Sequence, residues 1–395
     1  MQSLNIQFNA LRQSPTVAMA DRILALKASG RKLIGLQVGD PDFGTPPAVL
    51  EVAAKAMQEG FTHYGPSKGY PELRQAAALK LERDNGVHAA YDPETELLVT
   101  HGGIHAYYLA MQSILNPGDE VLVPDPSWGT HANMATMLRA NVIRVPAPAE
   151  DGFIPPLESW QKALTSKTRV IVLNYPSNPT GAYPTREYLE QLQSFAAKHH
   201  LWIVSDTVYE NLYYGEKPTS AAAFEGAKER TILVNSLSKT YAMTGWRVGY
   251  LAAPQAVIDN ALKAGQNSIT CVAPFVQKAA AFALTDPAAQ QATADMRAAY
   301  ARRRDRVLRI SHELESEKVL VTPPQGAFYF FLDVRPLKMT SLEICERILE
   351  EAGVGLVPGS GFGAQGEGFI RMTIAASDEE VEAGFRKIVE WAEKQ

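Results

Sequence analysis

A lysine and an arginine follow one apolar segment at a spacing that suits an activated amine. In the segment TILVNSLSKTYAMTGWRVGY, the apolar run 231–235 leads to Lys239, and Arg247 stands eight residues later. A lysine amine attacks a carbonyl group only in its neutral form, and burial or a neighbouring cation lowers the lysine pKa toward that form. Arg247 could supply this cation and also bind an anion. Because a lysine after a strand is usually a solvated loop residue, this interpretation needs support from other residues.

A carboxylate and a tyrosine stand at the end of a second apolar run. Asp206 ends the run WIVSD, and Tyr209 follows three residues later. A buried carboxylate is costly unless it meets a cation, and a protonated ring nitrogen would be one. Asp206 could equally cap a helix, and Tyr209 could belong to the core. These two residues alone leave both alternatives open.

Two glycines form a candidate phosphate site. Gly102 and Gly103 lie between the run LLVT and an apolar helical pattern, where backbone amides at the helix start would be available to an anion. A glycine pair before a helix is more often simple turn chemistry. Asn178 in NYPSNPTG and Trp128 in PDPSWGT follow further strands. The first is typical of a turn and the second of the core, although a tryptophan can stack on a planar ring.

A glycine-rich segment near the C-terminus imitates a dinucleotide-binding motif. VGLVPGSGFGA places Gly359, Gly361 and Ala364 after a predicted strand, and Asp378 follows. That motif requires a helix directly after the glycines, but the next residues, GEGFIRMTIA, are strand-like. We therefore expect no nicotinamide cofactor. The histidines lack a metal-ligand spacing, no Gly-x-Ser-x-Gly elbow is present, and the arginine-rich stretch ARRRDRVLR is expected to face solvent.

Composition and charge exclude several classes of function. The 395 residues are 46% hydrophobic and 21% charged, with a formal net charge of -5. This balance is typical of a globular protein, and the negative charge disfavours nucleic acid and anionic membranes as partners. Cys271 and Cys345 are too few for a disulfide framework, and no apolar run reaches the roughly 18 residues of a membrane span. We expect a cytoplasmic protein without a metal.

The candidate residues need a scaffold that brings distant segments together, and the central part of the sequence predicts one. Between residues 96 and 253, short apolar runs alternate with helical stretches, which indicates an α/β fold with a parallel sheet covered by helices. In such sheets the ligand crevice lies at the carboxyl ends of strands, where Asn174, Asp206 and Asn235 stand. The seven predicted strands are Leu97–Thr100, Glu120–Pro124, Val142–Val145, Arg169–Asn174, Trp202–Asp206, Thr231–Asn235 and Val248–Ala252.

The C-terminal part has a different character and predicts a smaller α+β domain. A charged helix around residues 300–316 precedes the strand-like GAFYFFL, a helix, VGLVP, FIRMTIA and a final helix. The segment GLQVGDPDFGTPP is typical of a loop and could line the crevice. We expect an N-terminal arm with part of the small domain at 1–47, a large domain at 48–285 and the small domain at 286–395.

Taken in order, eight segments of the chain resemble the class I aminotransferases, which are fold type I pyridoxal phosphate enzymes. The segments are GDPDFGTPP, HYGPSKGYPELR, HGGIHA, YPSNPTG, SDTVYE, SLSKTYAMTGWR, GAFYFFLD and FIRMT. The resemblance spans nearly the whole chain, and its middle part matches in residue type, order and spacing. It implies a large domain with a mostly parallel seven-stranded sheet and a smaller α+β domain. It also implies a ping-pong transfer of an amino group between an L-amino acid and a 2-oxo acid.

The resemblance implies that five side chains act on the pyridoxal phosphate. Lys239 would bind the cofactor aldehyde covalently and, once released by substrate, would move the proton between Cα and C4′. Asp206 would keep the pyridine nitrogen protonated, so that the ring accepts electrons. Asn178 and Tyr209 would hydrogen-bond the ring 3′ oxygen, and Trp128 would stack on the ring.

The resemblance also implies which groups hold the two anionic ends. The substrate α-carboxylate would bind Arg371 as a two-pronged pair, with Asn178 beside it and the backbone of Gly39 closing over it. Tyr64 would reach the cofactor phosphate from a second subunit, which implies a homodimer with shared active sites. The other phosphate ligands would be the backbone amides of Gly103 and Ile104 and the side chains of Ser236, Ser238 and Arg247.

Two positions depart from the family pattern. Relatives that handle aspartate can carry a basic residue where Ile104 stands. A second substrate carboxylate therefore has no partner here unless His105, or a neighbouring subunit near Gln266 and Asn267, supplies one. Thr207 stands where an acidic residue often follows the aspartate, which should matter little to the cofactor.

Two other functions stay open at this point. A pyridoxal-phosphate-dependent carbon–sulfur β-lyase would use the same scaffold and the same lysine. A non-catalytic ligand sensor would not need Lys239, Asp206 and Arg371 together, so the three residues favour an enzyme. Transamination is the function that we expect.

Overall fold

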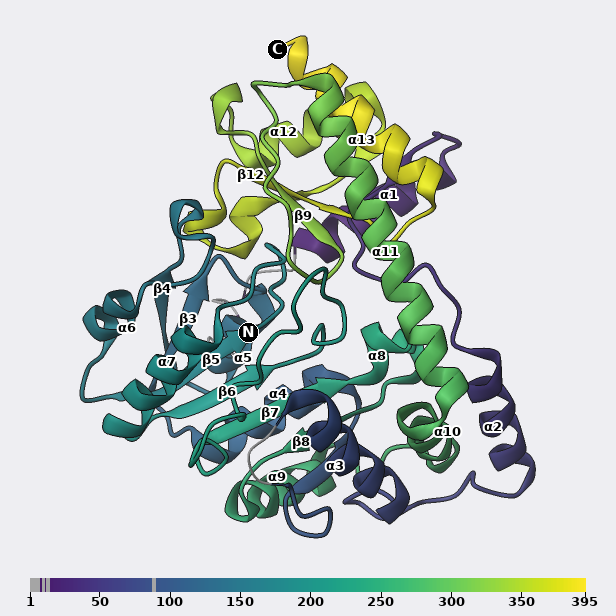
Figure 1. The fold of residues 1–395 in the computed structure, drawn as a ribbon, viewed down its shortest axis with the longest axis vertical. Coiled ribbons are helices and arrows are strands. Elements are labelled where there is room, and N and C mark those ends of the chain that lie inside the picture. Colours follow the sequence, from purple (N-terminus) through teal and green to yellow (C-terminus); the bar gives the residue numbers. More distant parts are fainter. Residues whose placement is uncertain (1–7, 9–10, 12–14, 87–89) are drawn as a thin grey trace, which may run out of the picture.

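A seven-stranded sheet lies at the centre of the larger part of the molecule (Figure 1). This computed structural model describes residues 8, 11, 15–86 and 90–395. The strand order is β2-β8-β7-β6-β5-β3-β4, and only β8 runs antiparallel to its neighbours. The strands are β2 (Leu97–Thr100), β3 (Glu120–Asp125), β4 (Asn141–Pro146), β5 (Thr168–Asn174), β6 (Trp202–Asp206), β7 (Thr231–Ser236) and β8 (Gly249–Ala252). All seven predicted strands are confirmed, each to within one residue at either end.

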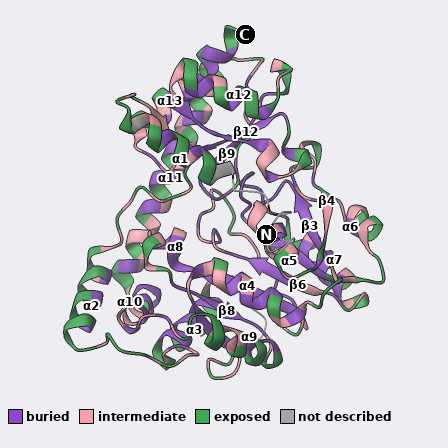
Figure 2. Cartoon of the chain, turned by 180° about the vertical axis from the view of Figure 1, so that it is seen from behind, coloured by how far each residue is buried: buried purple, intermediate pink, exposed green. Residues whose placement is uncertain are grey.

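The central strands are buried on both faces because their alternate side chains enter different cores (Figure 2). On β5, Val170 and Val172 pack into one core, whereas Ile171 and Leu173 pack into another. Strands of this kind are continuous apolar runs, which is why the sequence predicts them well. One face is covered by α4 (Gly102–Ile114), α5 (Gly129–Met137) and α9 (Gln255–Ser268), and the other by α2 (Pro47–Gln58), α3 (Pro71–Asn85), α6 (Leu157–Ala163), α7 (Arg186–Lys198) and α10 (Pro274–Thr285).

A smaller group of elements lies at the top of Figure 1 and is built from both ends of the chain. Its core includes Leu36, Phe330, Ile370 and Phe385. Strands β1 and β10 pair in parallel, and three others form an antiparallel sheet in the order β11-β12-β9. The elements are α1 (Pro15–Ala28), β1 (Ile34–Gly35), β9 (Tyr329–Asp333), α12 (Ser341–Arg347), β10 (Val354–Gly355), β11 (Val357–Pro358), β12 (Phe369–Thr373) and α13 (Asp378–Glu393).

A long helix, α11 (Pro287–Leu314), runs from the large group of elements to the small one (Figure 1). The helix predicted around residues 300–316 therefore begins earlier in the sequence than we expected. The Asp286 carboxylate accepts hydrogen bonds from the amides of Ala288 and Ala289 and caps the helix there. The first half, PAAQQATADMR, is rich in alanine and glutamine, which favour a helix without the charge that marks the second half.

The arginine-rich stretch of α11 is not wholly solvated, so that expectation was wrong at one residue. Arg303 is 7% exposed and forms ion pairs with Asp42 and Asp378. The stretch is amphipathic, and Arg303 is on its inner side, where the two carboxylates offset the cost of burying the cation.

The glycine-rich segment 359–366 forms two short 3-10 helices, η6 (Gly359–Phe362) and η7 (Ala364–Gly366), before strand β12. The α-helix that a dinucleotide motif requires does not follow the glycines. None of the described helices is long and apolar enough to span a membrane. The remaining short elements are η2 (Ala149–Asp151), α8 (Leu237–Thr240), η3 (Thr244–Trp246), η4 (Arg335–Leu337) and the π-helix η5 (Ile348–Ala352).

Candidate active site

A cavity of about 420 Å³ lies where the carboxyl ends of β5, β6 and β7 meet the small sheet. Strand β5 ends at Asn174 and β6 at Asp206, and these two residues are register partners. This is the edge at which open α/β sheets bind ligands. Twelve of the thirteen predicted site residues line the cavity: Gly39, Gly103, Ile104, Trp128, Asn178, Asp206, Tyr209, Ser236, Ser238, Lys239, Arg247 and Arg371.

The short helix α8 carries Lys239 into the cavity. Its Nζ donates a hydrogen bond to the carbonyl oxygen of Gly39 at 2.6 Å. Burial lowers the pKa of Lys239 to about 8, and the nearby cations Arg371 and Arg247 act in the same direction, while Asp40 opposes them. A substantial fraction of the amine is therefore neutral in mildly alkaline solution, as a nucleophile or proton acceptor requires.

Asp206 is 5% exposed and is held by a histidine and a backbone amide. Its Oδ2 lies 3.1 Å from Nε2 of His131, which donates because a carboxylate only accepts. The amide of Val208 donates to Oδ1 at 3.2 Å. Residues 208–211 form a turn rather than an α-helix, so the alternative in which Asp206 caps a helix is wrong. The carboxylate is instead fixed in direction at the cavity wall.

Several groups that can bind an anion lie at the start of α4 and in the segment after β7. No side chain caps α4, so its first backbone amides point outward from the helix end. A Cβ on Gly102 would come within 2.7 Å of Arg247 Nη2, which places the guanidinium directly at this helix end. Ser236 and Ser238 add two hydroxyls 2.8 Å apart. Helix end, cation and hydroxyls together suit a phosphate group.

Arg371 is a buried cation on β12, with 1% of its surface exposed. Its Nη1 donates to Asn178 Oδ1 at 2.9 Å, and its Nη2 donates to the carbonyl of Gln37 at 2.6 Å. Its Nε is buried without a partner, and no carboxylate of the described residues forms an ion pair with it. Burial lowers the pKa of Arg371. Among the described residues, Arg371 is therefore not one half of a structural ion pair.

Tyr209 shares a hydrogen bond with Tyr329, their hydroxyl oxygens lying 2.9 Å apart, and both side chains line the cavity. Burial raises the pKa of each phenol, so both are neutral at physiological pH. A Cβ on Gly39 would collide with the Tyr329 hydroxyl, so only glycine fits there. The backbone of Gly39 can therefore approach both Lys239 and this tyrosine.

Two side chains of the site were missed in the sequence. His131 lies on α5, is fully buried and reaches Asp206. Tyr329 begins β9 in the run FYFFL, where a tyrosine is expected to belong to the core. A lone histidine in a helix and a tyrosine in an apolar strand carry no local signal of function. His131 follows Trp128 by three residues, one helical turn, which is the only hint available.

Tyr64 is the one predicted site residue that does not line this chain's cavity. Its side chain is 88% exposed. A single chain therefore offers Tyr64 to solvent or to another subunit.

The residues of the cavity fit pyridoxal phosphate in chemical type. A neutral amine suits its aldehyde, a buried carboxylate suits its ring nitrogen, and the helix end with Arg247 and two serines suits its phosphate. Trp128 lies at the cavity wall with a flat face for a ring.

Comparisons with known proteins agree with this fit. Residues 31–388 match the sequence model of the family described as aminotransferase class I and II. The chain is 39% identical over 362 residues to the aspartate aminotransferase of Pyrococcus abyssi, covering 91% of this chain and 92% of that protein. It is 40% identical over 351 residues to the aromatic-amino-acid aminotransferase 2 of Thermococcus litoralis, covering 89% of both.

A solved structure shows the same fold. The Thermus thermophilus aspartate aminotransferase with maleate is 38% identical and superposes with a TM-score of 0.93, covering 99% of this chain and 100% of that one. Nothing in these comparisons supports the carbon–sulfur lyase. The chain belongs to the class I and II aminotransferases, and it is a pyridoxal-phosphate-dependent transaminase that transfers an amino group between an amino acid and a 2-oxo acid.

Proposed function

We propose that this cavity performs transamination with Lys239 as the proton carrier and Arg371 as the carboxylate anchor. The observation that carries the proposal is the buried guanidinium of Arg371, which has no carboxylate partner among the described residues and lies near Lys239. A buried cation without a counter-charge is costly. The α-carboxylate of an amino acid or 2-oxo acid would offset that cost and bring Cα toward the lysine amine.

Each side chain around the reacting centre has a separate task. When bound, pyridoxal phosphate supplies a ring that accepts electrons from the substrate Cα. Lys239 would hold the cofactor and would then carry the proton between Cα and C4′. Asp206 would keep the ring nitrogen protonated, and the hydrogen bond from His131 fixes the direction of its carboxylate. Asn178 and Tyr209 would hydrogen-bond the 3′ oxygen.

Separate groups would hold the phosphate and the substrate carboxylate. The phosphate would be held by the amides of Gly103 and Ile104 and by the side chains of Ser236, Ser238 and Arg247. Trp128 would stack on the ring. The carboxylate would be held by Arg371, with Asn178 and the backbone of Gly39 contributing. Its two oxygens match the planar fork of the guanidinium.

The mouth of the cavity favours an apolar substrate side chain over a second carboxylate. Val17, Val38 and Ile104 come from three separate segments, line the cavity and are 57%, 39% and 44% exposed. Apolar side chains gathered at a cavity mouth are typical of a hydrophobic ligand. The cations among the described lining residues are Lys239, Arg247 and Arg371, each with a task above.

The histidine next to Ile104 does not replace the missing cation. Burial lowers the pKa of His105 to about 4, and the neighbouring His101 contributes in the same direction. His105 is therefore neutral at pH 7 and offers no charge to a second carboxylate. Relatives of this chain are named for aspartate and for aromatic amino acids. We place this chain with those that accept apolar or aromatic side chains.

We also propose that the protein is cytoplasmic and forms a homodimer, in which Tyr64 completes the site of the partner subunit. The high exposure of Tyr64 and the unpaired thiols of Cys271 and Cys345 support this assignment. We also propose domain boundaries at 1–47, 48–285 and 286–395, supported by the pairing of β1 with β10 and by the start of α11 at Pro287.

A panel of amino donors tests the substrate assignment. We expect phenylalanine, leucine and methionine to exceed aspartate in kcat/KM by about tenfold or more, with 2-oxoglutarate or pyruvate as acceptor. Ile104→Lys should raise kcat/KM for aspartate and lower it for phenylalanine. Leu79→Lys is the matched control, because Leu79 is 59% exposed on α3 and lies outside the cavity lining. A preference for aspartate in the unmodified enzyme would reject the apolar assignment, and release of ammonia and pyruvate from cystathionine would reject transamination as its main activity.

A further inference from the structure

A buried polar cluster lies behind the site, on the side of the sheet away from the cavity. The Glu210 cluster consists of Lys80, Thr207, Glu210 and Asn235, which are 2%, 5%, 7% and 3% exposed. Lys80 comes from α3, Thr207 and Glu210 follow β6, and Asn235 lies near the end of β7. None of the four lines the cavity, and transamination as described above uses none of them.

The side-chain amide of Asn235 is hydrogen-bonded to two other members of the cluster. Nδ2 of Asn235 donates to Glu210 Oε1 at 2.7 Å and to Thr207 Oγ1 at 2.9 Å. Lys80 Nζ also donates to Oε1 of Glu210 and forms an ion pair with it. The other atom of the Asn235 amide, Oδ1, accepts from the amide of Ser236 at 2.7 Å. Together with the bond from the backbone amide of Thr207 to the carbonyl of Val234, this side chain ties the turn after β6 to the end of β7.

The two tied segments carry functional residues on their opposite sides. In the turn 206–210, Asp206 and Tyr209 line the cavity, whereas Thr207 and Glu210 belong to the cluster. In the segment 235–239, Asn235 belongs to the cluster, whereas the next residues supply the two serines and Lys239 to the cavity. A shift of Glu210 relative to Asn235 would therefore change the separation of the Asp206 carboxylate from the Lys239 amine.

We propose that Glu210 is a positioning residue, which sets the geometry between Asp206 and Lys239 by accepting the hydrogen bond from Asn235. This inference rests on the proposed roles of those two residues. The ion pair with Lys80 holds the Glu210 side chain in place and offsets its negative charge. On the outer side of the cluster, Asp84 lies 3.9 Å from Lys80 and 3.9 Å from Lys217.

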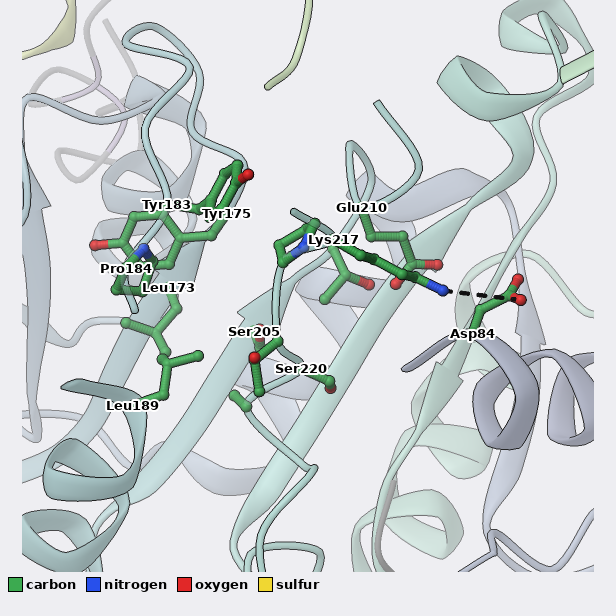
Figure 3. A pocket seen from close by; sticks show the side chains of 14 residues that line it. Asp84, Leu173, Tyr175, Tyr183, Pro184, Leu189, Ser205, Glu210, Lys217 and Ser220 are labelled. Atoms are coloured by element: carbon green, nitrogen blue, oxygen red, sulfur yellow. Dashed lines mark ion pairs between the residues drawn. The ribbon is translucent and has the colours of Figure 1, made fainter. Parts of the chain in front are cut away.

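Figure 3 shows the outer boundary of the cluster. Glu210, Lys217 and Asp84 lie on one side of a small cavity of about 20 Å³, with the Lys217–Asp84 ion pair dashed. This volume is room for about one water molecule, so the back of Glu210 has no space for a substrate. A buried ion pair is often no more stabilising than apolar residues of the same size. Stability alone therefore does not account for the cluster.

Two double variants separate position from charge. Lys80→Met with Glu210→Gln removes both charges but keeps an oxygen that accepts from Asn235. Lys80→Met with Glu210→Leu removes both charges and that acceptor. Both lack the two charges, and they differ in whether position 210 offers an acceptor to Asn235. The measurements are kcat and KM of cofactor-saturated enzyme, the melting temperature, and the pH at which the absorbance of the lysine-bound cofactor changes.

We expect the Gln variant to keep kcat within about twofold of the unmodified enzyme. The Leu variant should lose about tenfold in kcat with KM nearly unchanged, the size of one neutral hydrogen bond. Its absorbance midpoint should move as well, because the distance between the Asp206 carboxylate and the lysine changes. A merely structural role predicts equal kcat and equal midpoints in both variants, whatever their melting temperatures, and that result would overturn the proposal.

A milder change guards against a Leu variant that does not fold. Thr207→Val is nearly isosteric and removes the Thr207 hydroxyl, which accepts from Asn235 and donates to the carbonyl of Val234. It should shift the absorbance midpoint in the same direction and lower kcat by a smaller factor. Asp84→Asn is the control, because Asp84 contacts the outer side of Lys80 and makes no bond to Asn235. A midpoint that moves in Asp84→Asn but not in Thr207→Val would also overturn the proposal. If the unmodified enzyme, the Gln variant and Asp84→Asn all show no transamination, the result would instead reject the proposed function.

Discussion

The protonation of Lys239 determines the pH at which the apoprotein can react with an aldehyde. Since the pKa is lowered to about 8, mainly by burial, the neutral fraction rises as the pH increases through 8. In the unfolded chain the same amine should become neutral only near the ordinary lysine pKa of about 10.4. We predict that acylation of Lys239 in the folded apoprotein has its midpoint near pH 8, measured by peptide mass spectrometry. Equal midpoints in the folded and the denaturant-unfolded protein would contradict this.

Arg371 should act on substrate binding rather than on the cofactor. Charge-assisted hydrogen bonds contribute about 1.5 to 3 kcal/mol each, so loss of a two-pronged pair should weaken carboxylate binding by on the order of a hundredfold. We predict that Arg371→Lys raises KM for amino acid and oxo acid by about that factor and leaves the cofactor spectrum intact. Lysine is a poor replacement because its point charge cannot reproduce the planar fork. Unchanged KM values with a lowered melting temperature would remove Arg371 from the substrate site.

The sequence predicts those site residues whose chemistry is visible in their local context. Asp206 ends an apolar strand and Arg371 interrupts one, and a charge at such a position needs an explanation. Lys239 follows β7 by three residues, and the family resemblance, rather than the local pattern, gives the roles of Lys239 and Arg371. His131 is different, because it reaches Asp206 only through the packing of α5 on the sheet. Contacts between residues 75 positions apart depend on the completed fold, which no local pattern records.

At the scale of elements, apolar runs predict strands better than charge predicts helices. The inner strands of the seven-stranded sheet, such as β5 and β7, are buried on both faces and are therefore mainly apolar, whereas the edge strand β4 is only partly buried. Helix α11 was identified from its charged half alone, and its alanine-rich half was missed. The burial of Arg303 was missed for a related reason. Its carboxylate partners, Asp42 and Asp378, come from distant segments of the chain.

The loop that carries Gly39 shows how elements fix a site. Asp42 binds Arg303 of α11, while Thr45 donates to the carbonyl of Ala242 at 2.8 Å and accepts from Trp246 Nε1 at 3.0 Å. The loop is therefore fastened to the small group of elements at one point and to the large group at another. Gly39 lies just before these anchors, which explains why its carbonyl is held at Lys239.

At the scale of the whole molecule, one chain supplies nearly all of the site but leaves one predicted contributor outside it. The cavity draws on α1, the loop that contains Val38 and Gly39, several strand and helix ends of the large sheet region, and the small sheet. Tyr64 lies in none of these positions, and its side chain is 88% exposed in this chain. We therefore expect the proposed contact of Tyr64 with the phosphate to be made in the site of another subunit.

A hybrid dimer tests whether Tyr64 serves the partner's site. In a dimer of one Tyr64→Phe chain and one Lys239→Ala chain, sharing across the interface gives one site with both Tyr64 and Lys239 intact, and the other site lacks both. Cofactor affinity at the single lysine-bearing site should then equal that of the unmodified enzyme. The Tyr64→Phe homodimer should bind cofactor roughly ten- to a hundredfold more weakly, because a hydrogen bond to a charged phosphate is lost. If Tyr64 served its own chain, the lysine-bearing site of the hybrid would show the weakened affinity of that homodimer. Cofactor titration of purified hybrids, followed by absorbance, distinguishes the two arrangements.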